Sequence, residues 1–138
     1  MILSTAYFLA RNGKRLAGLR GQVEVIRQGR GTAEEFSLLG KAMERYRDFL
    51  RDNLAPLSLG ERKAVESRLF PAISPLVEEA QVLVDAAWKS GRIPECLLCD
   101  LGMLGSSLLF VAAFESFMVE AREPGGKKPF PLRKGWSR

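Results

Sequence analysis

Two cysteines three residues apart form the most recognisable chemical motif in the chain. Cys96 and Cys99 are its only cysteines, and on a helix this spacing places both thiols on one face, where they can meet one metal ion. Zinc needs four ligands, so a complete site requires four thiolates shared across a symmetric dimer. A thioredoxin-type redox pair needs a strand and a turn before its helix. We therefore expect both cysteines to pack as small buried hydrophobic residues, with no metal and no cofactor.

Three acidic residues interrupt apolar sequence and are the candidates for acid/base chemistry. Asp85, Asp100 and Glu115 each stand among hydrophobic neighbours, where burial would raise the carboxyl pKa or require a basic partner. A pair of such carboxylates can transfer protons. We expect structural ion pairs with the first helix, or helix-end contacts, in place of catalysis.

The chain contains no histidine, which removes the usual general base at neutral pH and the Ser–His and Cys–His nucleophile pairs. The stretch 125–128, Gly-Gly-Lys-Lys, resembles a phosphate-binding loop only faintly, because no strand precedes it and no helix follows it. The sequence therefore predicts a protein that is not an enzyme.

Length and composition place these residues in one soluble domain. The chain has 138 residues, 46% hydrophobic and 27% charged, which is ordinary for a globular protein and sufficient for a core without disulfides. Its first ten residues are apolar, but no basic residue precedes them and no small-residue cleavage site follows. We expect a cytoplasmic protein.

No segment shows the alternation of a half-buried strand, so the predicted fold is all-α: a single-domain bundle of about five helices over residues 1–122, with an irregular basic tail over 123–138. A seven-residue apolar repeat predicts one long first helix ending near Gln28. The alternative is a break at Asn12-Gly13. The repeat consists of Ile2, Leu9, Leu16 and Val23, with Leu19 and Ile26 on the same side.

The second helix is expected to begin at Thr32, which forms a capping-box pattern with Glu35, and to end before Pro56. Its apolar stripe consists of Phe36, Leu39, Met43, Tyr46, Leu50 and Leu54.

Prolines divide the next stretch into two predicted helices. A short third helix opens with the capping-box pair Ser58 and Glu61 and stops at Pro71. A fourth begins at Ser74-Pro75 and runs to about Ser90, before Gly91. Its predicted core side consists of Leu76, Val77, Ala80, Leu83, Val84, Ala87 and Trp88.

A fifth helix is expected from Pro94 to about Arg122. It is apolar almost all round, which is typical of a central helix wrapped by its neighbours. Its uncharged run, Leu101 to Phe114, has 14 residues. That is shorter than the roughly 20 residues of a membrane span, so we favour a core helix over a membrane anchor.

Charge is unevenly distributed along the sequence, and this distribution is the basis of the functional hypothesis. The net charge is +5 over residues 1–31, −4 over 32–122 and +4 over 123–138. These basic ends contact another macromolecule, lie on the acidic middle of the same chain, or simply form a solvated surface that keeps the protein soluble. The candidate contacts are Arg11, Lys14, Arg15, Arg20, Arg27, Lys127, Lys128, Phe130, Arg133, Lys134 and Trp136.

The preferred hypothesis is a non-enzymatic helical binding protein, a regulator, inhibitor, adaptor or assembly subunit that contacts a protein or a nucleoprotein complex. The first alternative is direct nucleic-acid binding, with the basic residues on phosphates and the tail aromatics stacked on bases. The second is membrane association through the helix around 97–119. A homodimer through the first helix is a further alternative, although Asn12 occupies an expected apolar position.

Overall fold

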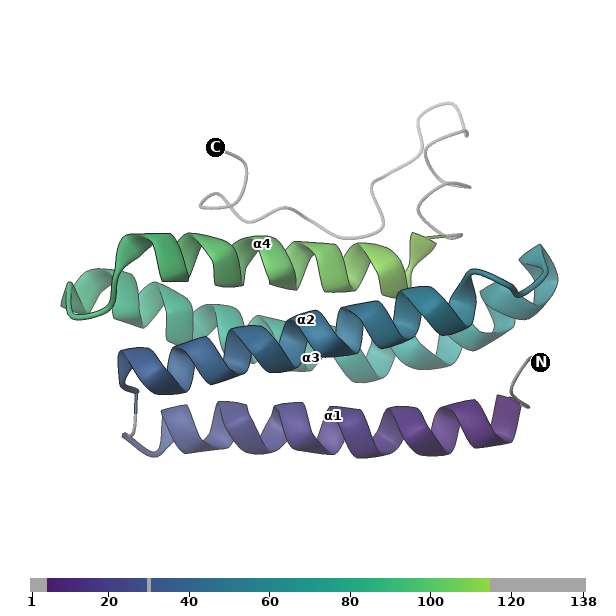
Figure 1. The fold of residues 1–138 in the computed structure, drawn as a ribbon, viewed down its shortest axis with the longest axis horizontal. Helices are drawn as coiled ribbons and strands as arrows, with labels where there is room; N and C mark the ends of the chain where they lie inside the picture. Colours follow the sequence, from purple (N-terminus) through teal and green to yellow (C-terminus); the bar gives the residue numbers. More distant parts are fainter. Residues whose placement is uncertain (1–4, 30, 115–138) are drawn as a thin grey trace, which may run out of the picture.

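The computed structural model describes residues 5–29 and 31–114, and every regular element in these ranges is a helix. Four helices follow one another: α1 (Thr5–Arg27), α2 (Ala33–Leu54), α3 (Leu59–Ser90) and α4 (Glu95–Ala112) (Figure 1). The all-α prediction is confirmed. The expected division into about five helices is wrong for the described residues, and the tail over 123–138 lies outside them.

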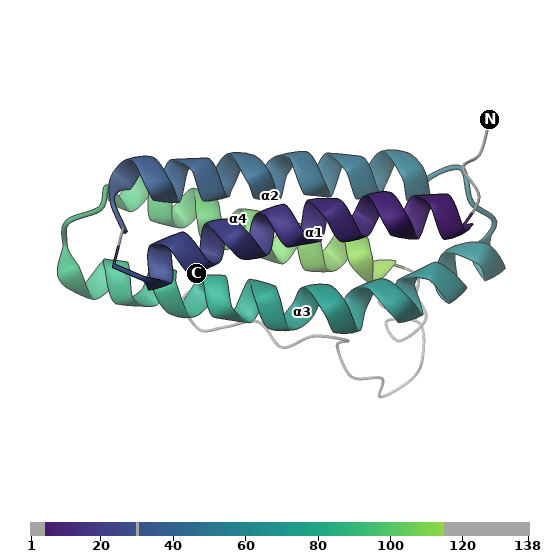
Figure 2. The same ribbon diagram turned by 90° about the horizontal axis from the view of Figure 1, so that it is seen from below.

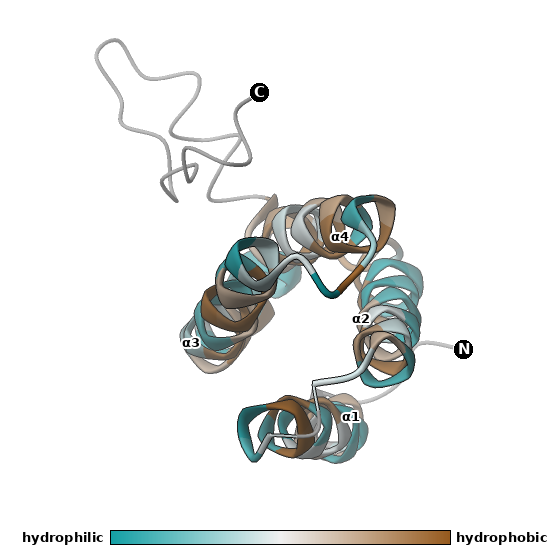
Figure 3. Ribbon diagram, turned by 90° about the vertical axis from the view of Figure 1, so that its left-hand side faces the viewer, coloured by the Kyte–Doolittle hydropathy of each residue, from teal (hydrophilic) through white to brown (hydrophobic). Residues whose placement is uncertain are grey.

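The four helices form an up-and-down bundle in which α1 lies opposite α4. Viewed along the bundle, α2 and α3 occupy the two sides between them (Figure 3). From below, α1 lies between α2 and α3, with α4 behind (Figure 2). The helix α4 packs on both α2 and α3, whereas α1 packs more closely on α2 than on α3. One face of α1 and one face of α4 therefore point away from the bundle.

The apolar stripe predicted for α2 is buried along its whole length, together with Phe49, which the prediction omitted. Thr32 caps the helix as expected, because its Oγ1 accepts a hydrogen bond of 3.2 Å from the Glu35 amide. The reciprocal half of the capping box is absent. The Glu35 carboxylate instead accepts a bond of 2.8 Å from Gln22 Nε2 on α1, so a contact between helices replaces the local one.

Helix α1 continues through Asn12-Gly13, as the seven-residue repeat predicts. Asn12 is buried, and its Oδ1 accepts a hydrogen bond from the Tyr46 hydroxyl of α2. A buried amide with a partner does not interrupt the apolar face, so the helix needs no turn there. It ends just before Gly29, whose φ of 94° favours glycine.

The predicted third and fourth helices are one helix, α3, with Pro71 and Pro75 inside it. Each proline removes a bond to the carbonyl four residues earlier, that of Ser67 and that of Pro71. Ser67, Pro71 and Pro75 are all exposed, so water can donate hydrogen bonds to the carbonyls of Ser67 and Pro71. On the opposite side, Leu69 and Ile73 are buried without interruption. Core packing across both prolines therefore outweighs two lost backbone bonds.

The ends of α3 match the sequence patterns. Ser58 and Glu61 form the complete capping box, and Gly91 ends the helix in the left-handed conformation with a φ of 68°. The prediction that Trp88 is a core residue is wrong, because 41% of its surface is exposed. It lies in the last turn, at the end of the bundle.

The helix expected to be central, α4, is one of four around a shared core: it packs extensively on α2 and α3 but is not wrapped on all sides by the described helices. Helix α4 approaches α2 closely at Gly40, where an added Cβ would lie 3.4 Å from Leu101 Cδ2. No other described helix covers its other side, where Met103 is 71% exposed. Among the described helices, α4 is long and apolar enough to cross a membrane by length and composition, with 39% of that window buried in the bundle. Such a segment also occurs as a core helix of soluble proteins.

Candidate interaction surface on the first helix

The inner face of α1 fixes which of its residues point outward. The Phe8 ring stacks on Phe49 of α2 with centroids 5.5 Å apart, and Asn12 binds Tyr46 one turn later. The remaining contacts toward the core are apolar: Leu16, Leu19, Val23 and Ile26 are all buried. The predicted stripe is confirmed for these residues, Leu9 is half-buried, and Ile2 lies outside the described residues. All the cations of α1 consequently lie at the surface.

Two of these cations are held against aromatic rings. The Arg15 guanidinium lies 4.5 Å from the centroid of the Phe49 ring, and that of Arg11 lies 5.5 Å from the same ring and 5.9 Å from Tyr7. A cation over an aromatic face is attracted by the ring quadrupole. Both guanidinium groups are thus positioned by carbon surfaces, while neither forms an ion pair with a described acid.

Lys14 and Arg20 are also exposed, and neither has a hydrogen bond or ion pair to another described residue. Small residues separate them on the outward side of α1. A Cβ added at Gly13, Gly18 or Gly21 would meet nothing within 4 Å. The backbone of α1 is therefore unusually accessible beside these two cations.

Arg27 differs from the other four candidate contact residues of α1, because it already forms ion pairs with two acidic residues of the bundle. Its Nη2 lies 2.6 Å from Glu79 Oε2 on α3, and its Nη1 lies 2.8 Å from Glu24 Oε2. The hydrogen bond and charge of Glu79 raise the pKa of Arg27 above its ordinary value. Arg11, Lys14, Arg15 and Arg20 are thus the exposed cations of α1 that have no acidic partner among the described residues, and they are hereafter called the α1 basic face. Arg11 and Arg15 lie on the flank beside Phe49, whereas Arg20, about two and a half turns after Arg11, lies on the other flank.

Comparison with known proteins adds no relative. No protein-family model, curated protein or solved structure matches this chain. Support for the candidate surface therefore comes from the geometry of the structure, and none comes from related proteins. Six further predicted contacts belong to residues outside the described ranges: Lys127, Lys128, Phe130, Arg133, Lys134 and Trp136.

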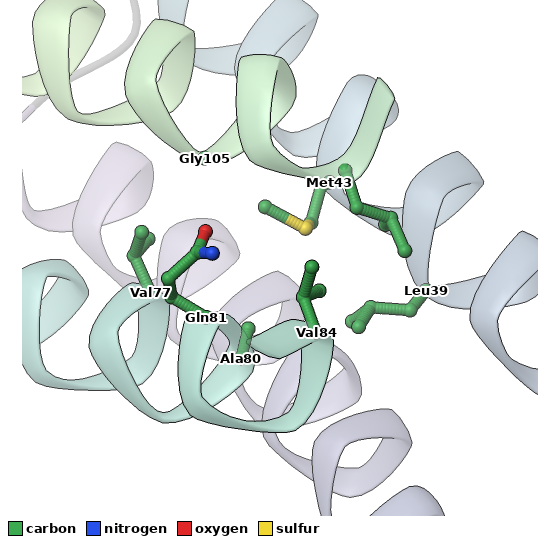
Figure 4. A pocket seen from close by; sticks show the side chains of 8 residues that line it. Leu39, Met43, Val77, Ala80, Gln81, Val84 and Gly105 are labelled. Atoms are coloured by element: carbon green, nitrogen blue, oxygen red, sulfur yellow. The ribbon is translucent and has the colours of Figure 1, made fainter. Parts of the chain in front are cut away.

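A small interior space lies between α2, α3 and α4 (Figure 4). The amide of Gln81 points into it among apolar side chains, and its Nε2 donates a bond of 2.8 Å to Asp85 Oδ1. No part of the space holds a water-sized sphere. It is therefore a packing irregularity around a buried amide. The other lining residues are Leu39, Met43, Val77, Ala80, Val84, Leu101 and Gly105.

The expectation that Cys96 and Cys99 are buried is wrong: both are free and exposed. They occupy the first turns of α4 on its outward side, which no other described helix covers. Asp100 is exposed on the same helix and Asp85 is half-buried beside Gln81, while Glu115 lies outside the described residues.

The prediction missed the buried carboxylate of α3. Glu66 is 1% exposed, and its Oε2 lies 2.9 Å from Nε of Arg62 one turn earlier. The Arg62 guanidinium also lies 4.8 Å from the Phe114 ring centroid, beyond the end of α4. The four-residue spacing of Arg62 and Glu66 is a visible sequence signal for a pair.

Proposed function

We propose that this protein is a non-enzymatic helical binding protein that uses the α1 basic face to contact an acidic surface of another protein, as a regulator, inhibitor, adaptor or assembly subunit. The observation that carries the proposal is the group of four exposed cations, Arg11, Lys14, Arg15 and Arg20, that have no acidic partner among the described residues. The other end of the same helix shows the contrast, because Arg27 has two.

The placement of Arg11 and Arg15 suits binding. Ordering a long side chain at an interface costs about 0.5–1.5 kcal/mol. Stacking on Phe49 restricts both guanidinium groups before a partner arrives and leaves their N–H donors in solvent. Arginine can then donate two parallel hydrogen bonds to one carboxylate.

The outward glycines of α1 add a steric argument. Because Gly13, Gly18 and Gly21 have open space above them, an element of the partner can approach the helix backbone closely between the cations. A surface with long side chains at these positions would hold that element further away. An acidic helix or strand edge can approach this stretch of backbone while its carboxylates meet the exposed cations.

A nucleic acid is the alternative ligand, because phosphates accept the same hydrogen bonds as carboxylates. The two ligands differ in their response to salt. Binding to duplex DNA weakens with a log–log slope of about −0.9 per phosphate contact. A protein interface with a packed apolar centre responds less.

The test is native co-purification of the full chain, with and without nuclease, using two variants of equal charge change. Lys14→Gln with Arg20→Gln alters the α1 basic face, whereas Lys41→Gln with Arg45→Gln removes two exposed, unpaired cations from α2. We expect a stoichiometric, nuclease-resistant protein that the first variant loses and the second retains.

Two results would overturn this proposal. Capture of nuclease-sensitive nucleic acid, lost only in the α1 variant, would replace it with the nucleic-acid function. Equal capture by wild type and both variants would show that the α1 basic face is a solvated surface.

A further inference from the structure

Three sulfur-containing side chains lie exposed along one side of α4. Cys96 and Cys99 are free thiols at the surface, and Met103 follows with 71% of its surface exposed. Residues three and four apart are neighbours on a helix surface, so Cys99 lies next to both of the others. Hydrophobic packing, the role expected for both cysteines, does not explain this cluster.

We propose that Cys96, Cys99 and Met103 form a binding site for Cu(I), with two thiolates and one thioether as ligands. Thiolate and thioether are soft ligands, which select Cu(I), zinc and iron–sulfur clusters over hard cations. A carboxylate or an imidazole is not required. This inference is independent of the α1 basic face, which lies on the opposite side of the bundle (Figure 3).

The geometry of α4 favours a bridging ion over a direct sulfur–sulfur bond. Both cysteines belong to the regular helix Glu95–Ala112. Helix residues at this spacing have Cβ atoms about 5–6 Å apart, whereas a disulfide needs about 3.5–4.5 Å. A disulfide would therefore distort the first turns. Two metal–thiolate bonds, each about 2.3 Å for zinc, span a longer separation between the sulfurs.

Zinc fits the cluster less well than Cu(I). A structural zinc ion takes four ligands from cysteine, histidine or carboxylate side chains. Within residues 5–29 and 31–114, no group of three or more such side chains is placed to hold a metal ion. The thioether of Met103 can serve as a third ligand, beside the two thiolates, only for a soft metal ion.

The start of α4 also suits the charge of the complex. When one Cu⁺ ion binds, both thiols release a proton, so two thiolates and the ion together carry one negative charge. Pro94 precedes the helix and supplies no side-chain hydrogen bond to the amides of the first turn. Those amides and the positive end of the helix dipole stabilise an anion at this position, whereas the exposed carboxylates of Glu95 and Asp100 on the same helix oppose it.

The test titrates Cu(I) into the reduced full-length chain without oxygen, in competition with a chromogenic Cu(I) chelator. We expect one ion per chain and ultraviolet absorption from copper–thiolate bonds. Loss of an outer-shell partner typically costs about 10–100-fold in metal affinity, so loss of a thiolate ligand in Cys96→Ser or Cys99→Ser should cost about 100-fold or more. Met103→Leu, which keeps the volume and removes a weaker ligand, should cost about 10-fold. Circular dichroism checks that each variant retains its helices.

A matched control keeps two thiols but moves one off the shared face. Cys96→Ser with Leu97→Cys places the thiols two residues apart, on different sides of the helix, and should bind as weakly as Cys96→Ser alone. Wild-type affinity in this control would overturn the site, as would one ion per two chains. Unchanged affinity in Met103→Leu would overturn the assignment of the third ligand.

Discussion

The hydroxyl of Tyr46 on α2 donates a hydrogen bond to Oδ1 of Asn12 on α1, and both side chains are buried in the bundle. Besides apolar side chains, the α1–α2 contact includes the part-buried hydrogen bond from Gln22 to Glu35. A shift of α1 along α2 would bury the Tyr46 and Asn12 polar groups without partners, at a cost of about 1–3 kcal/mol for each. The pair therefore helps to fix the register that places Arg11 and Arg15 beside Phe49.

Removing one member of this pair should destabilise the bundle more than removing both. Tyr46→Phe leaves the Asn12 amide buried without its donor, so we expect the free energy of unfolding to fall by about 1–3 kcal/mol. Adding Asn12→Leu removes the unpaired amide and should recover part of the lost free energy of unfolding. Urea unfolding of the single and double variants measures this coupling. Equal stability of wild type and Tyr46→Phe would contradict it.

The same tyrosine predicts a loss of stability at alkaline pH. Burial raises the pKa of Tyr46 above its ordinary value of 10.0. Because the unfolded phenol ionises first, the stability contributed by the neutral phenol is complete below about pH 10 and declines as the pH rises above it. The stability difference between wild type and Tyr46→Phe should thus shrink above pH 10. A difference that stays constant through this range would refute the prediction.

Substitution of Pro75 distinguishes one long α3 from two helices. In a continuous helix, Pro75→Ala restores the bond to the Pro71 carbonyl, and we expect a gain of about 1–2 kcal/mol after the proline's effect on the unfolded chain is deducted. If Pro75 instead began a helix, alanine there would bring no gain. Urea unfolding gives the sign, and Lys63→Ala, at an exposed position on the same helix, controls for ordinary helix propensity.

Breaking the Arg62–Glu66 pair should be costly. Glu66 is buried, so Arg62→Met leaves a buried carboxylate without this cation and removes the contact with Phe114. The expected loss is about 3–5 kcal/mol. Adding Glu66→Leu removes the buried charge and should restore most of the stability. A single variant within about 0.5 kcal/mol of wild type would show that the pair contributes little.

Local sequence patterns determined the helices and many of their ends. The apolar stripe of α2, the capping box at Ser58 and Glu61, and the left-handed Gly91 were all predictable. Each depends on residues within one or two turns of each other, so the chain specifies it without knowledge of the fold. The presence of exposed cations on α1 was predictable for the same reason.

Only the tertiary structure decided which of these residues are buried or paired within the bundle and which are exposed to solvent. Pro71 and Pro75 lie within one helix because the core contacts of α3 continue on the side opposite the prolines. Arg27 is not part of the α1 basic face because it forms an ion pair with Glu79 of α3. The exposure of Cys96 and Cys99 has the same origin. Periodicity shows which residues share a face of a helix, but a face becomes buried only where another helix covers it. In this bundle, α2 and α3 cover one side of α4 and leave the thiols in solvent.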